Sequence, residues 1–236
     1  MHDNNLITSR YNDGDYLKKN KDWHAGDSSW KANQIDKIIK RNNLKLNSIC
    51  EIGCGAGEIL KQIQLKDAYK STKLSGYEIS DDAYALCKKK ETNNMKFFKT
   101  DLLLTDKVFD CVLCIDVFEH VENYIGFIKN LKKRGEYKLF HIPLDLSVSS
   151  LIRGKLLHAR DTVGHLHYFT PETSLATLKD CGYEIIDTMF TPSFACFPNK
   201  NIKSWIAKIP RNILYFFSPK ITSTILGGVS FMVLAK

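Results

Sequence analysis

Short apolar runs alternate with segments of helical periodicity between residues 48 and 190. Most of the runs are nearly continuous in apolar residues, which is typical of strands covered on both faces of a parallel sheet. Strands that alternate with helices indicate parallel βαβ units. We therefore predict an α/β fold with a doubly wound, mostly parallel seven-stranded sheet and helices on both faces. The predicted strands are SICEIG, KLSGYEIS, MKFFKT, FDCVLCID, YKLFHIP, YEIIDTMF and GGVSFMVLA.

The chain is predicted to form a single domain, 1–236, with three parts. Nothing marks a boundary in its first half, since there is no low-complexity linker and all 6 prolines fall at or after Pro143. Residues 1–45 are predicted to form an N-terminal helical lid, because DSSWKANQIDKIIKR places a tryptophan and three isoleucines near one helical face. Residues 46–190 form the core, and residues 191–236 add a helical insertion before the last strand.

Composition narrows the class of protein. With 236 residues and 44% hydrophobic content, the chain can bury a sizeable core. No signal peptide and no apolar stretch long enough to cross a membrane is visible, so we expect a cytoplasmic protein with reduced cysteines. Cys111 and Cys114 lie in one predicted strand, where side chains three apart point to opposite faces. Ordinary core packing is therefore favoured over a redox or metal pair.

The net charge of +8 is concentrated toward the C-terminus, where no acidic residue follows Asp187. Such a basic tail attracts nucleic acid, anionic lipid or a phosphorylated substrate. Within residues 200–222, large apolar side chains repeat at helical spacing with basic residues between them, and Pro210 is predicted to divide the segment into two short helices. Two interpretations stay open: a cap packed on the sheet, or an interfacial helix pair that makes peripheral contact with the anionic inner membrane surface.

The stretch ICEIGCGAGEIL ends a predicted strand with Glu51 and three glycines at alternate positions. In an open α/β sheet the first strand-to-helix turn comes closest to a ligand, and glycines expose its backbone amides. A nicotinamide-dinucleotide fingerprint would have its third glycine where this chain has Glu58. Glu51 also brings negative charge to the place where phosphates would lie. The turn therefore has neither the spacing nor the charge expected for the pyrophosphate of a dinucleotide.

The segment CEIGCGAG resembles the first motif of class I S-adenosylmethionine-dependent methyltransferases, and SGYEIS, FKTDLL and VLCIDVFEHVEN resemble later motifs in the same order. The resemblance covers residues 48 to 190 and implies a Rossmann-like fold with S-adenosyl-L-methionine as cofactor and S-adenosyl-L-homocysteine as product. Because this cofactor carries a sulfonium and an ammonium group, the resemblance implies an electronegative site free of phosphate-binding lysines. It implies that Glu78 holds the ribose hydroxyls. It places Asp101 beside the adenine amino group, with Leu102 packed on the ring. The implied cofactor-binding residues are Glu51, Gly53, Cys54, Gly55, Gly57, Glu78, Ile79, Asp101, Leu102, Cys114 and Ile115.

Methyl transfer is an in-line displacement at carbon, so the protein must align the acceptor atom and, for a hydroxyl, accept its proton. Histidine is the usual base near neutral pH. We predict His165 as the base, followed by His120 and then His141, all near predicted strand ends. The segment GHLHYFTPE resembles one in a methyltransferase subgroup associated with glycan and polysaccharide biosynthesis, in which the first histidine lines the active site. For each histidine alone, a hydrogen bond to loop backbone is the alternative.

The N-terminal segment KDWHAGDSSWKANQI resembles the leading segment of the same subgroup. Trp23, His24 and Trp30 are predicted to form a lid that presents aromatic surface to a sugar ring, with core packing of the tryptophans as the alternative. Trp30, His24 and His167 are the predicted substrate-binding residues.

The segment DVFEH raises the question of a metal. Ubiquinone-biosynthesis O-methyltransferases carry a similar cluster that binds a divalent cation, so the resemblance makes Asp116, Glu119 and His120 candidate ligands. Glu119 and His120 also suit a helix N-terminus, where negative charge is favourable. We predict no metal and keep this set of three as the alternative.

The leading hypothesis is an S-adenosylmethionine-dependent methyltransferase that acts on a hydroxyl of a sugar or glycan-biosynthesis intermediate. The alternatives are a quinone-type phenol acceptor, an amine acceptor, and a cofactor-binding interaction subunit without activity. We predict no nucleic-acid partner, because the chain lacks an Asn/Asp-Pro-Pro-aromatic motif for holding a flipped base and has no added recognition domain. The sequence does not indicate an oligomeric state.

Overall fold

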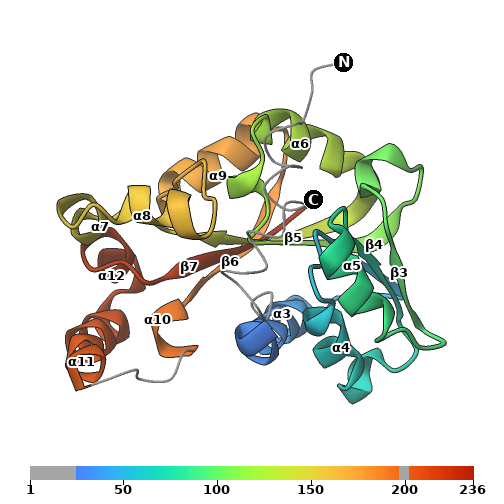
Figure 1. Cartoon of the computed structure of the whole chain (residues 1–236), viewed down its shortest axis with the longest axis horizontal. Helices are drawn as coiled ribbons and strands as arrows, with labels where there is room; N and C mark the ends of the chain where they lie inside the picture. Colours follow the sequence, from blue (N-terminus) through green and yellow to red (C-terminus); the bar gives the residue numbers. More distant parts are fainter. Residues whose placement is uncertain (1–24, 197–201) are drawn as a thin grey trace.

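A computed structural model describes residues 25–196 and 202–236 of the chain. Within these residues, seven strands form one sheet in the order β3-β2-β1-β4-β5-β7-β6 (Figure 1). The strands are β1 (Ser48–Ile52), β2 (Lys73–Tyr77), β3 (Met95–Phe98), β4 (Phe109–Ile115), β5 (Gly135–Pro143), β6 (Ile185–Thr191) and β7 (Ser230–Ala235). The predicted fold class is confirmed.

Six of the strands run in the same direction, and only the last strand, β7, runs opposite to them. β1 pairs in parallel with β2 and β4, while β7 lies antiparallel between β5 and β6. The strand order changes direction between β1 and β4. In doubly wound sheets this switch point opens a crevice beyond the carboxyl ends of the strands, and ligands bind there.

Helices cover both faces of the sheet. α3, α4 and α5 contribute buried residues to the core on one face, and α6 and α9 contribute to the core on the other. Figure 1 shows α6 and α9 above the sheet and α3 and α4 below it. The helices are α3 (Ser28–Arg41), α4 (Glu58–Gln64), α5 (Asp81–Lys88), α6 (Tyr124–Leu131), α7 (Val148–Ile152), α8 (Lys155–Thr162), α9 (Pro171–Asp180), α10 (Ser193–Cys196), α11 (Ile202–Phe217) and α12 (Pro219–Ile225).

The cysteine pair of β4 illustrates why a continuously apolar strand is buried on both sides. Cys111 belongs to the hydrophobic cluster under α3 and α4, and Cys114 belongs to the cluster under α6 and α9. Both thiols are buried and free. Burial raises the pKa of Cys111 to about 12, because the thiolate would lose its hydration. The pair packs in the core, as predicted.

The predicted division of residues 200–222 at Pro210 is wrong. α11 runs from Ile202 to Phe217 with Pro210 inside it, and the break comes at Ser218. The Ser218 hydroxyl accepts a hydrogen bond from the Ile221 amide and so caps α12, whose first residue is Pro219. A proline removes a single helical hydrogen bond, whereas a cap followed by proline provides a new helix start.

The predicted N-terminal lid falls partly outside the described residues, which begin at Ala25. Within them, α3 is a core helix: Ile35 and Ile38 are fully buried, and the helix packs against α4 and β6. The lid itself stays a prediction. No helix within residues 25–196 and 202–236 is long and apolar enough to cross a bilayer.

Candidate active site

The glycine turn after β1 forms one wall of a cavity at the switch point. Gly53, Gly55 and Gly57 have φ angles of 64°, 52° and 73°, a region that other residues rarely adopt. A Cβ at Gly55 would meet nothing within 4 Å, so its backbone faces open space. A Cβ at Gly57 would lie 2.6 Å from the Phe97 ring, so this glycine also lets the turn pack on β3.

The cavity has a volume of about 380 Å³, within the range of small-molecule sites. Its walls come from the N-terminal end of α3, the turn after β1, the ends of β2, β4 and β5, and the loop after α8. The lining residues are Asp27, Ser28, Lys31, Glu51, Gly53, Cys54, Gly55, Ala56, Glu58, Ile59, Glu78, Ile79, Ile115, Asp116, Val117, His120, Val121, Pro143, Val163 and His165. Seven of the eleven predicted cofactor-binding residues are among them: Glu51, Gly53, Cys54, Gly55, Glu78, Ile79 and Ile115.

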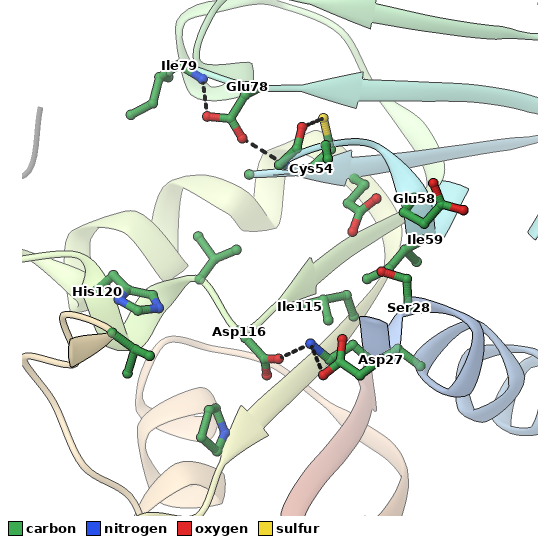
Figure 2. A pocket seen from close by; sticks show the side chains of 18 of the residues that line it. Asp27, Ser28, Cys54, Glu58, Ile59, Glu78, Ile79, Ile115, Asp116 and His120 are labelled. Atoms are coloured by element: carbon green, nitrogen blue, oxygen red, sulfur yellow. Dashed lines mark hydrogen bonds and ion pairs between the residues drawn. The ribbon is translucent and has the colours of Figure 1, made fainter. Parts of the chain in front are cut away.

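Glu78 is held at the end of β2 by backbone amides. One carboxylate oxygen accepts from the Gly55 amide at 2.8 Å, and the other accepts from the Ile79 and Ser80 amides, both at 2.8 Å (Figure 2). Burial raises the pKa of Glu78, while these three hydrogen bonds favour the ionised form and oppose the shift. The bonds also tie the tip of β2 to the glycine turn, so they fix the position of the carboxylate in the cavity.

Two other carboxylates in the cavity have an oxygen without a hydrogen-bond partner. Among the described residues, nothing bonds Glu51 Oε2 or Asp27 Oδ1, although both atoms are buried. Burial raises the pKa of Glu51 well above its usual range, and the nearby Lys31 ammonium counteracts part of that shift. A buried acceptor without a donor is costly, so these two atoms mark a place for a ligand that donates hydrogen bonds.

Lys31 corrects the expectation of a pocket without lysine. Its ammonium lies 2.9 Å from Asp27 Oδ2 and 2.9 Å from Asp116 Oδ2 (Figure 2). Burial lowers the pKa of Lys31, but the carboxylates of Asp116 and Asp27 outweigh this effect and raise it above the usual value. The carboxyl groups of Asp27, Asp116 and Glu51 lie around this one ammonium group. Three acidic groups therefore accompany one basic group, and the pocket keeps its acidic character.

His141 is a structural residue in this protein, which corrects its prediction as a third base. Nδ1 lies 2.6 Å from Asp116 Oδ1, and Nε2 lies 3.0 Å from the Thr191 hydroxyl. The side chain is buried and does not line the cavity. Burial disfavours the Asp116 carboxylate, but His141 and Lys31 together hold its pKa far below the usual value. The interaction joins α3, β4, β5 and β6 beneath the cavity.

His165 and His120 both line the cavity, and their ring centroids lie 4.8 Å apart. His165 Nδ1 lies 2.5 Å from Asp145 Oδ2, and His120 Nδ1 lies 3.2 Å from the Gly164 carbonyl oxygen. A carboxylate at Nδ1 fixes the ring orientation and favours the tautomer with a proton on Nδ1. Nε2 of His165 is then the nitrogen that has a lone pair.

Glu119 is buried next to the two histidines. Among the described residues, neither of its carboxylate oxygens has a hydrogen-bond partner, and burial raises its pKa well above the usual range. Side-chain atoms of Glu119, His120 and His165 lie within 4.8 Å of one another. The candidate metal ligands are therefore these three residues, and not the predicted set with Asp116, whose carboxylate is taken by Lys31 and His141.

Several predicted site residues lie elsewhere. Leu102 is fully buried in the core, so it does not reach the cavity, and Asp101 accepts a hydrogen bond from the Leu103 amide. Cys114 is also fully buried. His167 Nε2 lies 2.9 Å from the Val121 carbonyl oxygen, outside the cavity. Trp30 meets His141 edge to face at 6.1 Å. His24 and Trp23 lie outside the described residues, and Gly57 lies behind the cavity wall.

Four polar residues at the site were not predicted from the sequence. Asp27, Ser28 and Lys31 enter from α3, and Asp145 follows β5. Asp145 could have been predicted from its position, because ligands bind beyond strand ends and HIPLD places this carboxylate two residues past the end of a predicted strand. Nothing in the sequence distinguished Lys31 from the other lysines of its helix.

A family model described as "Methyltransferase domain" matches residues 28–188. The chain belongs to this family. The match covers α3, the glycine turn, strands β1 to β5 and the first part of β6, so it includes every lining residue of the cavity except Asp27. The predicted enzyme class, a methyltransferase, is confirmed.

Relatives that share the name ubiquinone biosynthesis O-methyltransferase match part of the chain. The ubiquinone biosynthesis O-methyltransferase of Rickettsia bellii is 33% identical over 104 residues, which is 42% of this chain and 42% of the relative. The enzyme of the same name from Rickettsia typhi is 29% identical over 100 residues, or 41% of this chain and 40% of the relative. The matched segment of the chain thus covers about two fifths of the length of each of these relatives. The names of these relatives do not show the predicted glycan-associated subgroup.

Solved structures share the fold over most of the chain. The magnesium protoporphyrin IX methyltransferase from Synechocystis PCC 6803 with bound SAH has a TM-score of 0.64 and 16% identity, covering 99% of both chains. A SAM-dependent methyltransferase from Archaeoglobus fulgidus has a TM-score of 0.55 and 19% identity, covering 87% of this chain and 94% of the other. At this level of identity the likeness supports the fold of the methyltransferase family.

Proposed function

We propose that this protein transfers the methyl group of S-adenosylmethionine to a hydroxyl oxygen, with His165 as the general base. The observation that carries the proposal is that His165 lines the same cavity as Glu78 and the glycine turn, while its Nδ1 lies 2.5 Å from Asp145 Oδ2. The cofactor is S-adenosylmethionine. The family match supports this assignment, and the carboxylates in the cavity suit a cation rather than a phosphate. When bound, the cofactor supplies a sulfonium-linked methyl group as the electrophile.

The cofactor half of the cavity has the groups that such a ligand needs. Glu78 presents a fixed carboxylate suited to two ribose hydroxyls. The unpartnered oxygens of Glu51 and Asp27 suit the ammonium group of the methionine part, which donates hydrogen bonds. The exposed backbone at Gly55 allows close approach to the turn. We assign these four residues to cofactor binding.

The acceptor half of the cavity supplies the proton transfer. The acceptor oxygen forms a bond to the methyl carbon while the bond between that carbon and sulfur breaks, leaving a neutral thioether. The hydroxyl proton passes to Nε2 of His165, and Asp145 stabilises the imidazolium that results. His120 lies beside the base and is placed to bind the acceptor oxygen.

The acceptor that fits best is a phenolic hydroxyl on an apolar ring. Near the two histidines, the lining side chains are Val117, Val121, Pro143 and Val163, which offer contact surface but no hydrogen bonds. A sugar ring, the acceptor predicted from the sequence, would leave several hydroxyls without partners there. The relatives named for ubiquinone biosynthesis also support an aromatic acceptor.

The experiment measures methyl transfer by mass spectrometry, with S-adenosylmethionine and a panel of acceptors: a hydroxybenzoate-type catechol, a nucleotide sugar and a primary amine. We expect methylation of the catechol. Methylation of only the sugar or only the amine would contradict the acceptor proposal and leave the cofactor proposal intact. Absence of S-adenosylhomocysteine binding in calorimetry would overturn both.

A second candidate is metal-assisted transfer, supported by the unpartnered Glu119 carboxylate beside two imidazoles. One carboxylate with two imidazoles suits Zn²⁺, Mn²⁺ or Fe²⁺ better than Mg²⁺, which prefers oxygen ligands. His165 would then be a ligand instead of the base. Metal content and calorimetric metal binding before and after chelation decide between the two: a stoichiometric metal whose removal abolishes transfer supports this candidate, and unchanged turnover without metal rejects it.

A further inference from the structure

Large apolar side chains are exposed on four helices at one end of the sheet. α11 exposes Phe216 and Phe217 at 83% and 77% of their surface, α7 exposes Ile152 at 81%, and α8 exposes Leu157 at 69%. We use the name helical face for these four side chains together with six others on α7, α11 and α12. The others are Val148, Leu151, Ile209, Ile213, Ile221 and Ile225. Exposed apolar surface concentrated in one place marks an interaction site in soluble proteins.

The helical face joins two segments that are distant in the sequence. Figure 1 shows α7, α8, α11 and α12 together at the end of the molecule away from α4 and β3. α12 contacts both α7 and α11. A Cβ at Gly227, just after α12, would lie 2.7 Å from the Ser147 hydroxyl, so the two segments approach closely. Burial and the nearby Arg153 lower the pKa of Arg211, which places these two cations near each other.

The charge around the helical face is strongly basic. The four helices carry one described carboxylate, Asp161, and Lys220 pairs with Glu172 of α9 at 2.7 Å. The described basic residues of these helices are Lys155, Arg160, Lys208, Arg211 and Lys220, and Arg153 directly follows α7. Cations beside exposed aromatic and aliphatic side chains are the combination that binds the surface of an anionic bilayer.

We propose that α7, α8, α11 and α12 dock together on a membrane surface that contains anionic lipid. α11 has its phenylalanines at one end and lysine and arginine along its length, which suits a helix that lies in the interface plane. A protein partner with matching charge would need an acidic apolar surface, for which nothing in this chain argues. From the sequence, membrane contact through residues 200–222 is one of two open interpretations; the structure adds α7 and α8 to that surface.

The docking surface lies beside the cavity. Val163 and His165, which line the cavity, follow directly after the last residue of α8. An apolar acceptor dissolved in the bilayer would thus enter next to the helix that binds the surface. This consequence rests on the proposed function, but the docking itself does not.

The test is flotation of the full chain with vesicles of phosphatidylcholine alone or with phosphatidylglycerol, in the absence of cofactor and acceptor. We expect binding only to the anionic vesicles, weakened by added salt. Phe216→Ser and, separately, Ile152→Ser should each lower the partition coefficient about tenfold, since each removes a large side chain from the bilayer. Lys155→Glu should lower it about fivefold. Leu104→Ser is the matched control, because Leu104 is 84% exposed at a site outside the helical face.

Wild-type protein that stays wholly at the bottom with anionic vesicles would overturn the proposal. If Phe216→Ser weakens binding but Ile152→Ser and Lys155→Glu behave like wild type, the joint surface is wrong and α11 acts alone. If light scattering shows a dimer that Phe216→Ser converts to monomer, without vesicle binding, the face is an interface between two copies. Circular dichroism of each variant verifies that the fold is retained. Because the assay uses neither cofactor nor acceptor, its failure is distinct from failure of the proposed function.

Discussion

The two halves of the cavity are built in different ways. In the cofactor half, the key groups follow directly after β1 and β2 and are tied together by backbone hydrogen bonds, as between Glu78 and Gly55. In the acceptor half, Glu119, Asp145 and His165 come from loops after β4, β5 and α8 and meet through their side chains. Under the proposed function, the backbone would hold a ligand common to a large family, while loop side chains, which are more easily replaced, would carry the chemistry.

The largest expected effect is in the acceptor half. His165→Ala should lower kcat by about 10²–10⁴-fold, because the variant cannot accept the hydroxyl proton. Calorimetric affinity for S-adenosylhomocysteine should stay unchanged, since the cofactor half is intact. His167→Ala is the control: His167 contacts the Val121 carbonyl outside the cavity, and its removal should leave kcat nearly unchanged. Equal losses in the two variants would remove His165 from the mechanism.

The converse pattern is expected in the cofactor half. Glu78→Ala should weaken S-adenosylhomocysteine binding about tenfold or more, because hydrogen bonds to a charged group contribute about 1.5–3 kcal/mol. Calorimetry measures the affinity, and Asp82→Ala, in α5 outside the cavity, is the control. Undiminished affinity in Glu78→Ala would contradict the assignment of this carboxylate to the ribose.

A smaller effect is expected for the positioning residue. Asp145→Asn keeps the side-chain shape but removes the charge that stabilises the His165 imidazolium, so kcat should fall about tenfold. The KM for S-adenosylmethionine should not change, and the pH dependence of kcat should shift. Asp145→Glu should restore part of the rate. A fall in thermal stability with an unaltered pH profile would indicate a purely structural role.

The smallest effect concerns stability. Burial raises the pKa of Glu119 in the folded protein, so the folded state binds more protons than the unfolded state above the unfolded pKa. Stability therefore falls as pH rises through that window. Glu119→Gln, which mimics the neutral carboxyl, should unfold at a higher temperature than wild type at pH 8, with a smaller difference at pH 5. Each kcal/mol corresponds to about 2–4 °C. An equal difference at both pH values would contradict the raised pKa.

Seven of the predicted cofactor-binding residues line the cavity, because their positions depend on local features of the sequence. Glu51, Glu78 and the glycine turn each lie at a predicted strand end, and the ends of parallel strands meet at one edge of the sheet. The strands themselves could be read from their apolar runs. Leu102 was misplaced because an apolar residue at a strand end looks the same whether it contacts a ligand or the core.

The acceptor half depended on the tertiary structure. Sequence spacing placed three histidines near strand ends, but only the packing of β6 against β7 brought Thr191 to His141 and made that residue structural. Lys31 reaches the cavity because α3 packs beside the switch point, and the same packing decides its partners.

The sequence by itself determined the order of strands and helices, the glycine turn and the acidic end of β2, since periodicity and backbone conformation are local properties. The tertiary structure decided which of the histidines lies against Asp145, and which apolar side chains of the helices remain exposed on the surface. These outcomes depend on contacts between residues far apart in the chain, and the sequence pattern around each residue carries no record of such contacts.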